Sequence, residues 1–289
     1  MNIVCEMSLR GAGGEPISFA RIHSHGCARL PPAAVQEDPL VYRRAFRIGA
    51  KVTNVAMHSR DGELVVETTR PLARRDAAAV EAAVARMFRF GDDLSPFYAQ
   101  IANDDSLAWA ASGAGRILAS PSVFEDVIKT ICTTNCAWSG TIRMTGALSD
   151  LGGGAFPEPT LVAQAPDSWF RDVARMGYRG AYVKTIARDV AAGTLDLEGL
   201  LDQRRPDEEV EEALLELPGI GPYGAAHVMQ LLGRHRQLVL DSWTRPKYRR
   251  LAGKKRAADS TIRRAFARYG SYAGLAFWLY LTRDWLAED

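Results

Sequence analysis

One carboxylate and one glycine-rich turn carry most of the chemistry that this sequence offers. Asp241 follows the apolar run at 238–240 and lies twenty residues after Gly221. A carboxylate held beside a sugar stabilises the positive charge that develops when an N-glycosidic bond breaks, and it orients or deprotonates the attacking water. At ~4 Å and an effective dielectric constant near 20, this attraction is roughly 4 kcal/mol. Asp241 equally suits the N-cap of a helix that begins at Ser242, and the two roles are compatible.

The turn is the string LPGIGPYGA at 217–225, which joins two helical segments. Glycine permits a positive φ and has no Cβ, so Gly219 and Gly221 allow backbone N–H groups to approach an anion closely. The helix that starts at Pro222 directs the positive end of its dipole to the same place. A phosphate bound in this way is recognised through the nucleic-acid backbone and not through bases, so the turn predicts contact without sequence preference.

The elements that must position these residues change character at about residue 76. Over 1–76, short runs rich in β-branched and aromatic residues are separated by turn residues, which predicts an antiparallel β-domain. Over 77–289, alanine-rich segments with helical spacing predict a helical core, so the fold class is α+β. We expect strands at 44–48, 51–57 and 63–68, and helices from a capping box at Ser122, over 170–192 with a break at Gly177, over 208–216, from Pro222 to Gly233 and over 271–286. The hairpin then spans 208–232, and we expect C-terminal helices over 242–289 to pack with 77–120.

The composition indicates a globular protein that acts away from membranes. No apolar run reaches the roughly 18 residues of a membrane span, and the N-terminus lacks a charged start followed by an apolar stretch, so we expect no membrane partner and no secretory leader. The four cysteines are too scattered for a disulfide framework, which suits a reducing cytosol. We therefore expect a cytoplasmic protein that is associated with the nucleoid.

Positive charge is concentrated in one stretch of the chain. The whole chain has a net charge of only +2, but residues 234–268 contain twelve Lys or Arg residues against two acidic residues. A basic face of this size suits a polyanion such as DNA, although a solvated helix surface would have the same composition.

The turn, the spacing and the aspartate together resemble the helix-hairpin-helix DNA glycosylases with a Gly/Pro-rich loop and a catalytic Asp. Within that superfamily the chain is most similar to the 8-oxoguanine glycosylases and the bacterial 3-methyladenine glycosylases II. The resemblance runs from about 88 to 287 and is weaker over the β-domain. It implies a two-lobed helical core, a monomer, and double-stranded DNA with a damaged base as the partner. It implies no cofactor beyond a monovalent cation on the hairpin carbonyls.

The resemblance also implies roles for individual residues. Asn135, at the end of the segment ICTTNC at 131–136, would fill the gap left by the flipped base, while Tyr178 would wedge into the base stack and Arg179 would meet the partner base. Asp241 would be catalytic. Further DNA contacts are expected from Gly219, Gly221, Tyr223, Gly224, Arg245 and Lys247, and a lesion pocket from His25, Gly26, Trp243, Phe277 and Leu281. A helix stop at Asn135 and core packing of Tyr178 are the alternatives.

Two departures from the family pattern bear on the chemistry. Bifunctional members carry a lysine in the hairpin that forms a Schiff base with the sugar, and we expect the corresponding position here to be Glu212, which cannot form an imine. We therefore expect a monofunctional enzyme, unless Lys184 or Lys247 substitutes. Where the 8-oxoguanine enzymes carry a glutamine that reads guanine, this chain has Phe277. An aromatic ring favours an electron-poor alkylated purine.

Several alternatives stay open at this stage. One alternative is an enzyme that removes oxidised or deaminated bases such as 8-oxoguanine or uracil. Another is a protein that binds DNA or DNA lesions without catalysis. No cysteine follows Cys136, which excludes the C-terminal iron–sulfur cluster of related branches. His23, His25 and Cys27 alternate like residues on one strand, but that spacing is poor tetrahedral geometry, so we predict no metal site.

Overall fold

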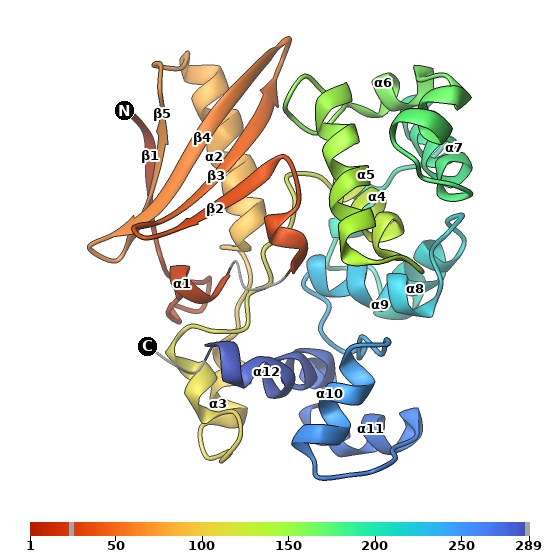
Figure 1. Cartoon of the computed structure of the whole chain (residues 1–289). Helices are drawn as coiled ribbons and strands as arrows, with labels where there is room; N and C mark the ends of the chain where they lie inside the picture. The colour runs from red at the N-terminus through yellow and green to blue at the C-terminus, as the bar shows by residue number, and fades with distance from the viewer. Residues whose placement is uncertain (23–25, 287–289) are drawn as a thin grey trace.

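A computed structural model describes residues 1–22 and 26–286, and it has the α+β class that the sequence predicts. A five-stranded antiparallel sheet with the order β1-β5-β4-β3-β2 precedes the main helical region (Figure 1). The strands are β1 (Asn2–Ser8), β2 (Ala33–Glu37), β3 (Leu40–Ile48), β4 (Lys51–Arg60) and β5 (Glu63–Thr68). The helices are α1 (Phe19–Ile22), α2 (Arg74–Phe88), α3 (Ser95–Ile101), α4 (Val123–Thr133), α5 (Trp138–Leu151), α6 (Pro159–Gln164), α7 (Arg179–Ala191), α8 (Asp207–Leu215), α9 (Pro222–Leu231), α10 (Thr244–Leu251), α11 (Asp259–Phe266) and α12 (Ala273–Leu286).

The three predicted strands are confirmed as β3, β4 and β5. The turn between β4 and β5 has positive φ at both Asp61 and Gly62, as a two-residue type I′ hairpin requires. The strand expected over 23–27 is wrong for the residues that the structure describes, because Gly26–Arg29 form a 3-10 turn. His23 and His25 lie outside the described residues.

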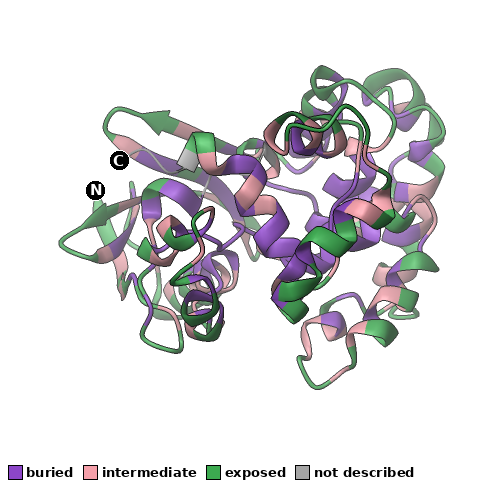
Figure 2. Ribbon diagram, turned by 90° about the horizontal axis from the view of Figure 1, so that it is seen from below, coloured by how far each residue is buried: buried purple, intermediate pink, exposed green. Residues whose placement is uncertain are grey.

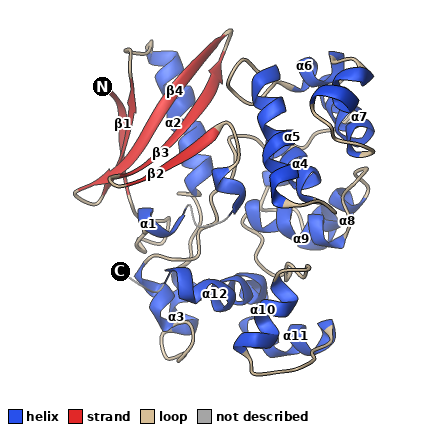
Figure 3. Ribbon diagram, viewed as in Figure 1, coloured by secondary structure: helices blue, strands red, loops and turns tan. Residues whose placement is uncertain are grey.

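One face of the sheet packs on α2 (Figure 3). Residues that alternate along β4 and β5 point to this face and are fully or almost fully buried against one stripe of the helix. Each such aliphatic side chain contributes roughly 1.5–3 kcal/mol when it is fully buried. This cluster contains Val55, Met57, Leu64 and Val66 from the sheet and Val80, Val84 and Met87 from the helix.

The remaining helices surround two further apolar clusters, and buried residues are concentrated where the elements meet (Figure 2). One cluster is built within residues 123–232 and includes α4, α7, α8 and α9. The other joins residues 94–114 to residues 238–281, so α3 packs with α12 across a long stretch of sequence. The segment before α7 differs from the predicted helix, because a π-turn at Trp169–Val173 is followed by a break at Gly177, where φ is +57°. No helix in the described ranges is long and apolar enough to cross a bilayer.

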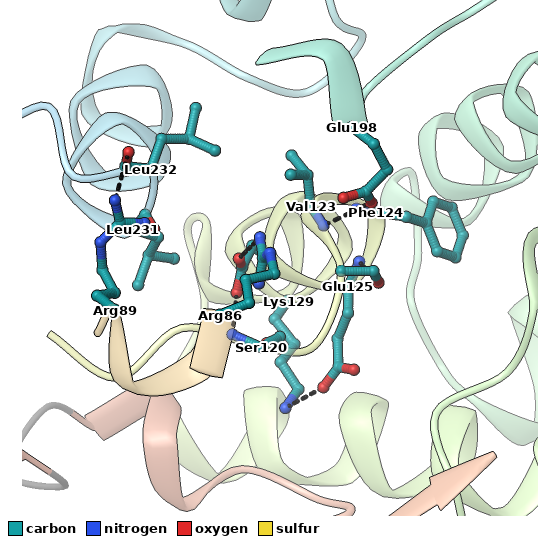
Figure 4. A network of polar contacts seen from close by, with 12 residues as sticks. Arg86, Arg89, Ser120, Val123, Phe124, Glu125, Lys129, Glu198, Leu231 and Leu232 are labelled. Carbon is teal, nitrogen blue, oxygen red and sulfur yellow. Dashed lines mark hydrogen bonds and ion pairs between the residues drawn. The ribbon is translucent and has the colours of Figure 1, made fainter. Parts of the chain in front are cut away.

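Buried ion pairs connect α4 to its neighbours (Figure 4). Ser122 caps α4 by accepting a hydrogen bond from the Glu125 N–H at 3.2 Å. The Glu125 carboxylate contacts Arg44 of β3 at 2.5 Å and Lys129 at 2.7 Å, so it is engaged away from the cap. Asp126 contacts Arg86 of α2 at 2.9 Å. Removal of one partner from such a pair costs about 3–5 kcal/mol, which fixes the sheet, α2 and α4 in place.

Candidate active site at the helical hairpin

A surface cavity of about 1050 Å³ brings most of the predicted site residues together. It lies where the end of α4, the start of α7, the α8–α9 hairpin and the segment before α10 meet. The cavity is lined by Asn135, Tyr178, Gly219, Gly221, Tyr223, Gly224, Asp241 and Arg245, all of which the sequence singled out. Thr133, Tyr182, Asp259 and Arg263 also line it and were not assigned a role from the sequence.

Asp241 is held by a reciprocal cap at the start of α10. Its Oδ1 accepts hydrogen bonds from the N–H groups of Trp243 at 2.8 Å and Thr244 at 2.6 Å, and its own N–H donates to the Thr244 hydroxyl at 2.8 Å. Both predicted roles are therefore geometrically compatible. Among the described residues, none donates a hydrogen bond to Oδ2. The half-buried carboxylate is thus fixed through one oxygen and leaves the other for chemistry in the cavity.

The hairpin presents unpaired backbone N–H groups to the same cavity. Four backbone N–H groups donate to no other described residue: those of Gly219, Gly221, Tyr223 and Gly224. Tyr223 and Gly224 lie in the first turn of α9, where the first backbone hydrogen bond is from Ala225 to the Gly221 carbonyl at 2.9 Å. Gly219 has a φ of +86°, and a Cβ there would lie 2.6 Å from the ring of Tyr182. The glycine is required both for its conformation and for this close approach. The positive end of the α9 dipole adds to the attraction for an anion.

Tyr223 is the side chain of the hairpin helix that lies in the cavity with Asp241. Its hydroxyl lies 3.3 Å from the Thr133 hydroxyl of α4, and its ring stacks on His227 with centroids 6.1 Å apart. Burial raises the pKa of Tyr223 to about 12, so the phenol is neutral at physiological pH. Burial likewise lowers the pKa of His227 to about 4, so this imidazole is neutral as well.

The position of Glu212 corrects one expectation from the sequence. Glu212 is exposed on α8 and does not line the cavity, so its identity has no direct bearing on the chemistry there. Tyr223 of α9, and not Glu212 of α8, is the hairpin residue with a long side chain that lines the cavity together with Asp241. Among the described residues that line the cavity there is no lysine.

Asn135 and Tyr178 lie side by side at the edge of the cavity and form what we call the probe pair. The Asn135 amide donates to the Tyr178 hydroxyl at 3.3 Å, and the Tyr178 side chain is 53% exposed. Arg179 does not share this exposure. Its buried guanidinium donates to the backbone carbonyls of Thr134 and Asn135, so the expected contact with a partner base is not the arrangement in this structure.

The two predicted basic contacts differ in their surroundings. Arg245 lines the cavity and makes two hydrogen bonds to Asp259, at 2.8 and 2.9 Å. Lys247 was expected to contact DNA, but it is only 5% exposed and is paired with Asp284. Its ammonium lies 5.4 Å from the ring centroid of Trp285. Because it faces the inside of the α10–α12 packing, Lys247 is unavailable to a phosphate in this structure.

The residues expected to form a lesion pocket do not converge. Phe277 is 1% exposed and Leu281 fully buried, and both lie in the apolar cluster of α3 and α12 and not in the cavity. Trp243 lies next to Asp241 and is 38% exposed. Gly26 starts the 3-10 turn, and His25 lies outside the described residues.

Trp243 belongs to a cluster of three tryptophans that the sequence only partly indicated. Its ring centroid is 5.9 Å from that of Trp278 and 5.3 Å from that of Trp285, both on α12. Trp285 is 50% exposed. The i, i+7 spacing of Trp278 and Trp285 indicates that both lie on one face of α12, whereas only the resemblance grouped Trp243 with residues of α12.

Comparisons with known proteins establish the fold. No family model and no curated protein matches the sequence. Among solved structures, a 3-methyladenine DNA glycosylase from Archaeoglobus fulgidus is 20% identical with a TM-score of 0.74, over 97% of this chain and 98% of that one. An 8-oxoguanine glycosylase/lyase from Clostridium acetobutylicum is 20% identical with a TM-score of 0.70, over 93% of each chain. The 3-methyladenine DNA glycosylase of Schizosaccharomyces pombe is 16% identical with a TM-score of 0.52, over 72% of this chain and 98% of that one. The resemblance to helix-hairpin-helix glycosylases is thereby confirmed for the fold.

Proposed function

We propose that this protein is a base-excision DNA glycosylase in which Asp241 supports hydrolysis of the N-glycosidic bond of a flipped nucleotide. The observation that carries the proposal is the arrangement of a single cavity. A carboxylate fixed through Oδ1 lies there with the unpaired N–H groups of the hairpin and with the probe pair of Asn135 and Tyr178. The carboxylate suits stabilisation of a developing positive charge, and the hairpin N–H groups suit binding of a DNA phosphate. The probe pair suits insertion into an opened base stack.

The proposed reaction uses Asp241 as an electrostatic and general-base group. As the base leaves, the sugar becomes an oxocarbenium-like cation, and the Oδ2 oxygen of Asp241 stabilises it and orients the attacking water. The hairpin N–H groups hold the backbone phosphate so that the sugar stays beside the carboxylate. Because the cap restrains the carboxylate before the substrate binds, little reorganisation is needed during the reaction.

We further propose that the enzyme is monofunctional. Schiff-base chemistry needs an amine beside the sugar, and the hairpin position in the cavity is Tyr223, whose neutral phenol cannot form an imine. Lys184 lies outside the cavity lining and pairs with Asp167 at 2.6 Å, and Lys247 is buried against Asp284. Water is therefore the proposed nucleophile, and the product is an abasic site.

An alkylated purine remains the favoured substrate, but the support for it changes. Phe277 is in the core, so we propose that the aromatic surface for the base is instead the tryptophan cluster that includes Trp243, two residues after Asp241. An electron-poor, positively charged base gains from the faces of Trp243 and Trp285 through stacking and cation–π attraction, worth about 0.5–2 kcal/mol.

Double-stranded DNA is the proposed partner. Among the structural neighbours, an 8-oxoguanine glycosylase/lyase is in complex with double-stranded DNA and a 3-methyladenine glycosylase is in complex with abasic DNA. We propose that the two helical clusters act as two lobes, with the duplex across the cavity between them, and that the protein works as a monomer. The exposed arginines and lysines around α10 and α11 would add affinity without sequence preference, and this affinity should fall steeply with salt. A monovalent cation on the hairpin carbonyls stays a prediction.

The experiment is base release from a panel of duplex oligonucleotides. The panel carries 3-methyladenine, 7-methylguanine, 1,N6-ethenoadenine, hypoxanthine, uracil and 8-oxoguanine, and the free base is quantified by chromatography. We expect release from the alkylated purines. Release confined to oxidised or deaminated bases would overturn the substrate assignment. Tight binding of damaged duplex with no release from any duplex would overturn the catalytic proposal in favour of lesion binding.

A further inference from the structure

We infer that Arg179 is a positioning residue that locks Asn135 and Tyr178 into one rigid unit before DNA binds. The inference rests on the proposed function only for its DNA readout. It assigns Arg179 to the protein's own backbone and not to a base of the opposite strand, so the opposite-base preference of the enzyme should not depend on it.

The guanidinium of Arg179 is committed to the loop that follows α4. Its Nε donates to the Thr134 carbonyl at 2.9 Å, its Nη2 donates to the Thr134 carbonyl and, at 3.0 Å, to the Asn135 carbonyl, and its Nη1 donates to the Met176 carbonyl at 3.3 Å. Arg179 is only 8% exposed. Carbonyls at the end of a helix lack partners within the helix, so these charge-assisted bonds satisfy groups that would otherwise need water.

The loop needs this support because Asn135 has a left-handed backbone. Its φ is +46°, a region that residues with a Cβ rarely adopt and that asparagine tolerates better than most. Arg179 bonds the carbonyl before this residue and the carbonyl of the residue itself. Two fixed carbonyls define the orientation of the peptide planes on both sides, and hence the direction in which the Asn135 side chain projects.

The same guanidinium also contacts the other member of the probe pair. Its Cζ lies 4.6 Å from the ring centroid of Tyr178, a cation–π contact, and the Tyr178 hydroxyl accepts the bond from Asn135. The Tyr178 ring meets Tyr182 edge to face at 5.7 Å, and Tyr182 packs in the space that Gly219 leaves by having no side chain. A continuous chain of contacts thus joins Asn135 through Arg179 and Tyr178 to the phosphate-binding hairpin.

The preassembled pair has a physical consequence for base flipping. Side chains that are ordered before binding lose less conformational entropy when they enter the duplex, so more of the contact energy is available to hold the opened state. Loss of Arg179 should therefore weaken the effect of both probe residues together. It should leave the chemistry at Asp241 intact once the base is extrahelical.

The test compares Arg179→Met, which keeps the length but removes the charge and all donors, with Arg179→Lys, which keeps the charge. Arg188→Met on the same helix is the matched control, because Arg188 is exposed and its ion pair among the described residues is with its neighbour Asp189. We expect R179M to lower kcat/KM on duplex substrate about 10- to 100-fold, as loss of a charge-assisted hydrogen bond predicts. R179K should be intermediate and R188M unchanged.

Two further readouts separate positioning from direct recognition. In a double-mutant cycle, R179M added to the Asn135→Ala/Tyr178→Ala variant should lower kcat/KM no further than that variant does alone, and the ranking of the four opposite bases should be the same in R179M as in the parent. If R179M abolishes that ranking, or if its effect is fully additive with the loss of both probe residues, Arg179 reads the partner base directly and the inference is wrong.

Hydrogen exchange on the free protein tests the inference without DNA. The amides of 134–136 should exchange faster in R179M and R179K than in the parent, while those of α5 and α9 stay unchanged and R188M shows no difference. Unchanged exchange at 134–136 would overturn the inference. If the parent protein releases no base from any duplex, the proposed function fails, yet this exchange experiment still decides whether Arg179 locks the loop. Should R179M fail to fold, R179K provides the same comparison.

Discussion

Asp241 offers the sharpest perturbation, because its two carboxylate oxygens have different tasks. Oδ1 accepts two backbone hydrogen bonds at the start of α10, while no described residue donates to Oδ2. Asn at 241 keeps a carbonyl oxygen for the cap and removes the charge, and Asn and Asp are equally good N-caps. Asp241→Asn should therefore fold and melt almost as the parent does, whereas Asp241→Ala loses the cap as well.

The expected magnitudes follow from these contacts. A carboxylate ~4 Å from the developing cation contributes roughly 4 kcal/mol at an effective dielectric constant near 20, which corresponds to a loss of about 10³-fold in the rate of base release. The cap adds about 1 kcal/mol of stability, so Asp241→Ala should melt about 2–4 °C below Asp241→Asn while both lose activity alike.

The assay is single-turnover base release together with thermal melting. Asp259→Asn is the matched control, because Asp259 lines the same cavity but is committed to Arg245 through two hydrogen bonds. We expect its rate to stay within tenfold of the parent's. If the rate of base release by Asp241→Asn also stays within tenfold of the parent's, or if its melting temperature falls as far as that of Asp241→Ala, the separate roles assigned to Oδ1 and Oδ2 are wrong.

Two substitutions in the hairpin and the titration of two buried histidines give further predictions. Tyr223→Lys places an amine beside Asp241 and should allow borohydride to trap the protein on DNA, which the parent should not show; absence of a trapped complex would mean that position 223 does not reach the sugar. Gly219→Ala should cost about 1–2 kcal/mol in urea unfolding and weaken DNA binding, because φ is +86° and the new Cβ meets Tyr182; an unchanged midpoint would contradict this. His227 and His235 have pKa values lowered by burial to about 4, below the ordinary 6.5 of an unfolded histidine. The unfolded state therefore binds protons first, so the stabilisation is complete above pH 6.5 and is lost as the pH falls towards 4, at an order of 3 kcal/mol for each histidine; urea unfolding between pH 7 and 4.5 measures it, and a constant free energy would refute it.

Local chemistry explains what the sequence predicted well. The hairpin at 217–225 and the cap at Asp241 are each defined within a few residues, so glycine, proline and aspartate indicate their conformations directly. The strands β3 to β5 are joined by tight turns and were predicted for the same reason. β1 was not singled out, because among the described strands it pairs with β5, about sixty residues later in the chain, and a local sequence pattern does not reveal such distant pairing.

Side-chain direction explains what the sequence predicted poorly. Phe277 and Trp278 are neighbours on α12, yet one is in the core and the other joins the tryptophan cluster, and only the packing of α3 and α10 decides which is which. Lys247 and Arg245 are likewise two residues apart on α10 and face opposite surroundings. The resemblance implied a contact between Arg179 and the partner base, which stays a prediction, whereas the sequence did not indicate that Arg179 bonds the carbonyls of the loop after α4.

We propose that the cavity around Asp241 cleaves the N-glycosidic bond with water and leaves the DNA strand intact. Free base and strand breaks can be quantified in the same single-turnover reaction on the best duplex of the panel, before and after hot alkali. We expect stoichiometric base release, with strand breaks only after alkali. Strand breaks that accumulate in step with free base before alkali would contradict it, because they require an amine at the sugar that the described cavity does not provide.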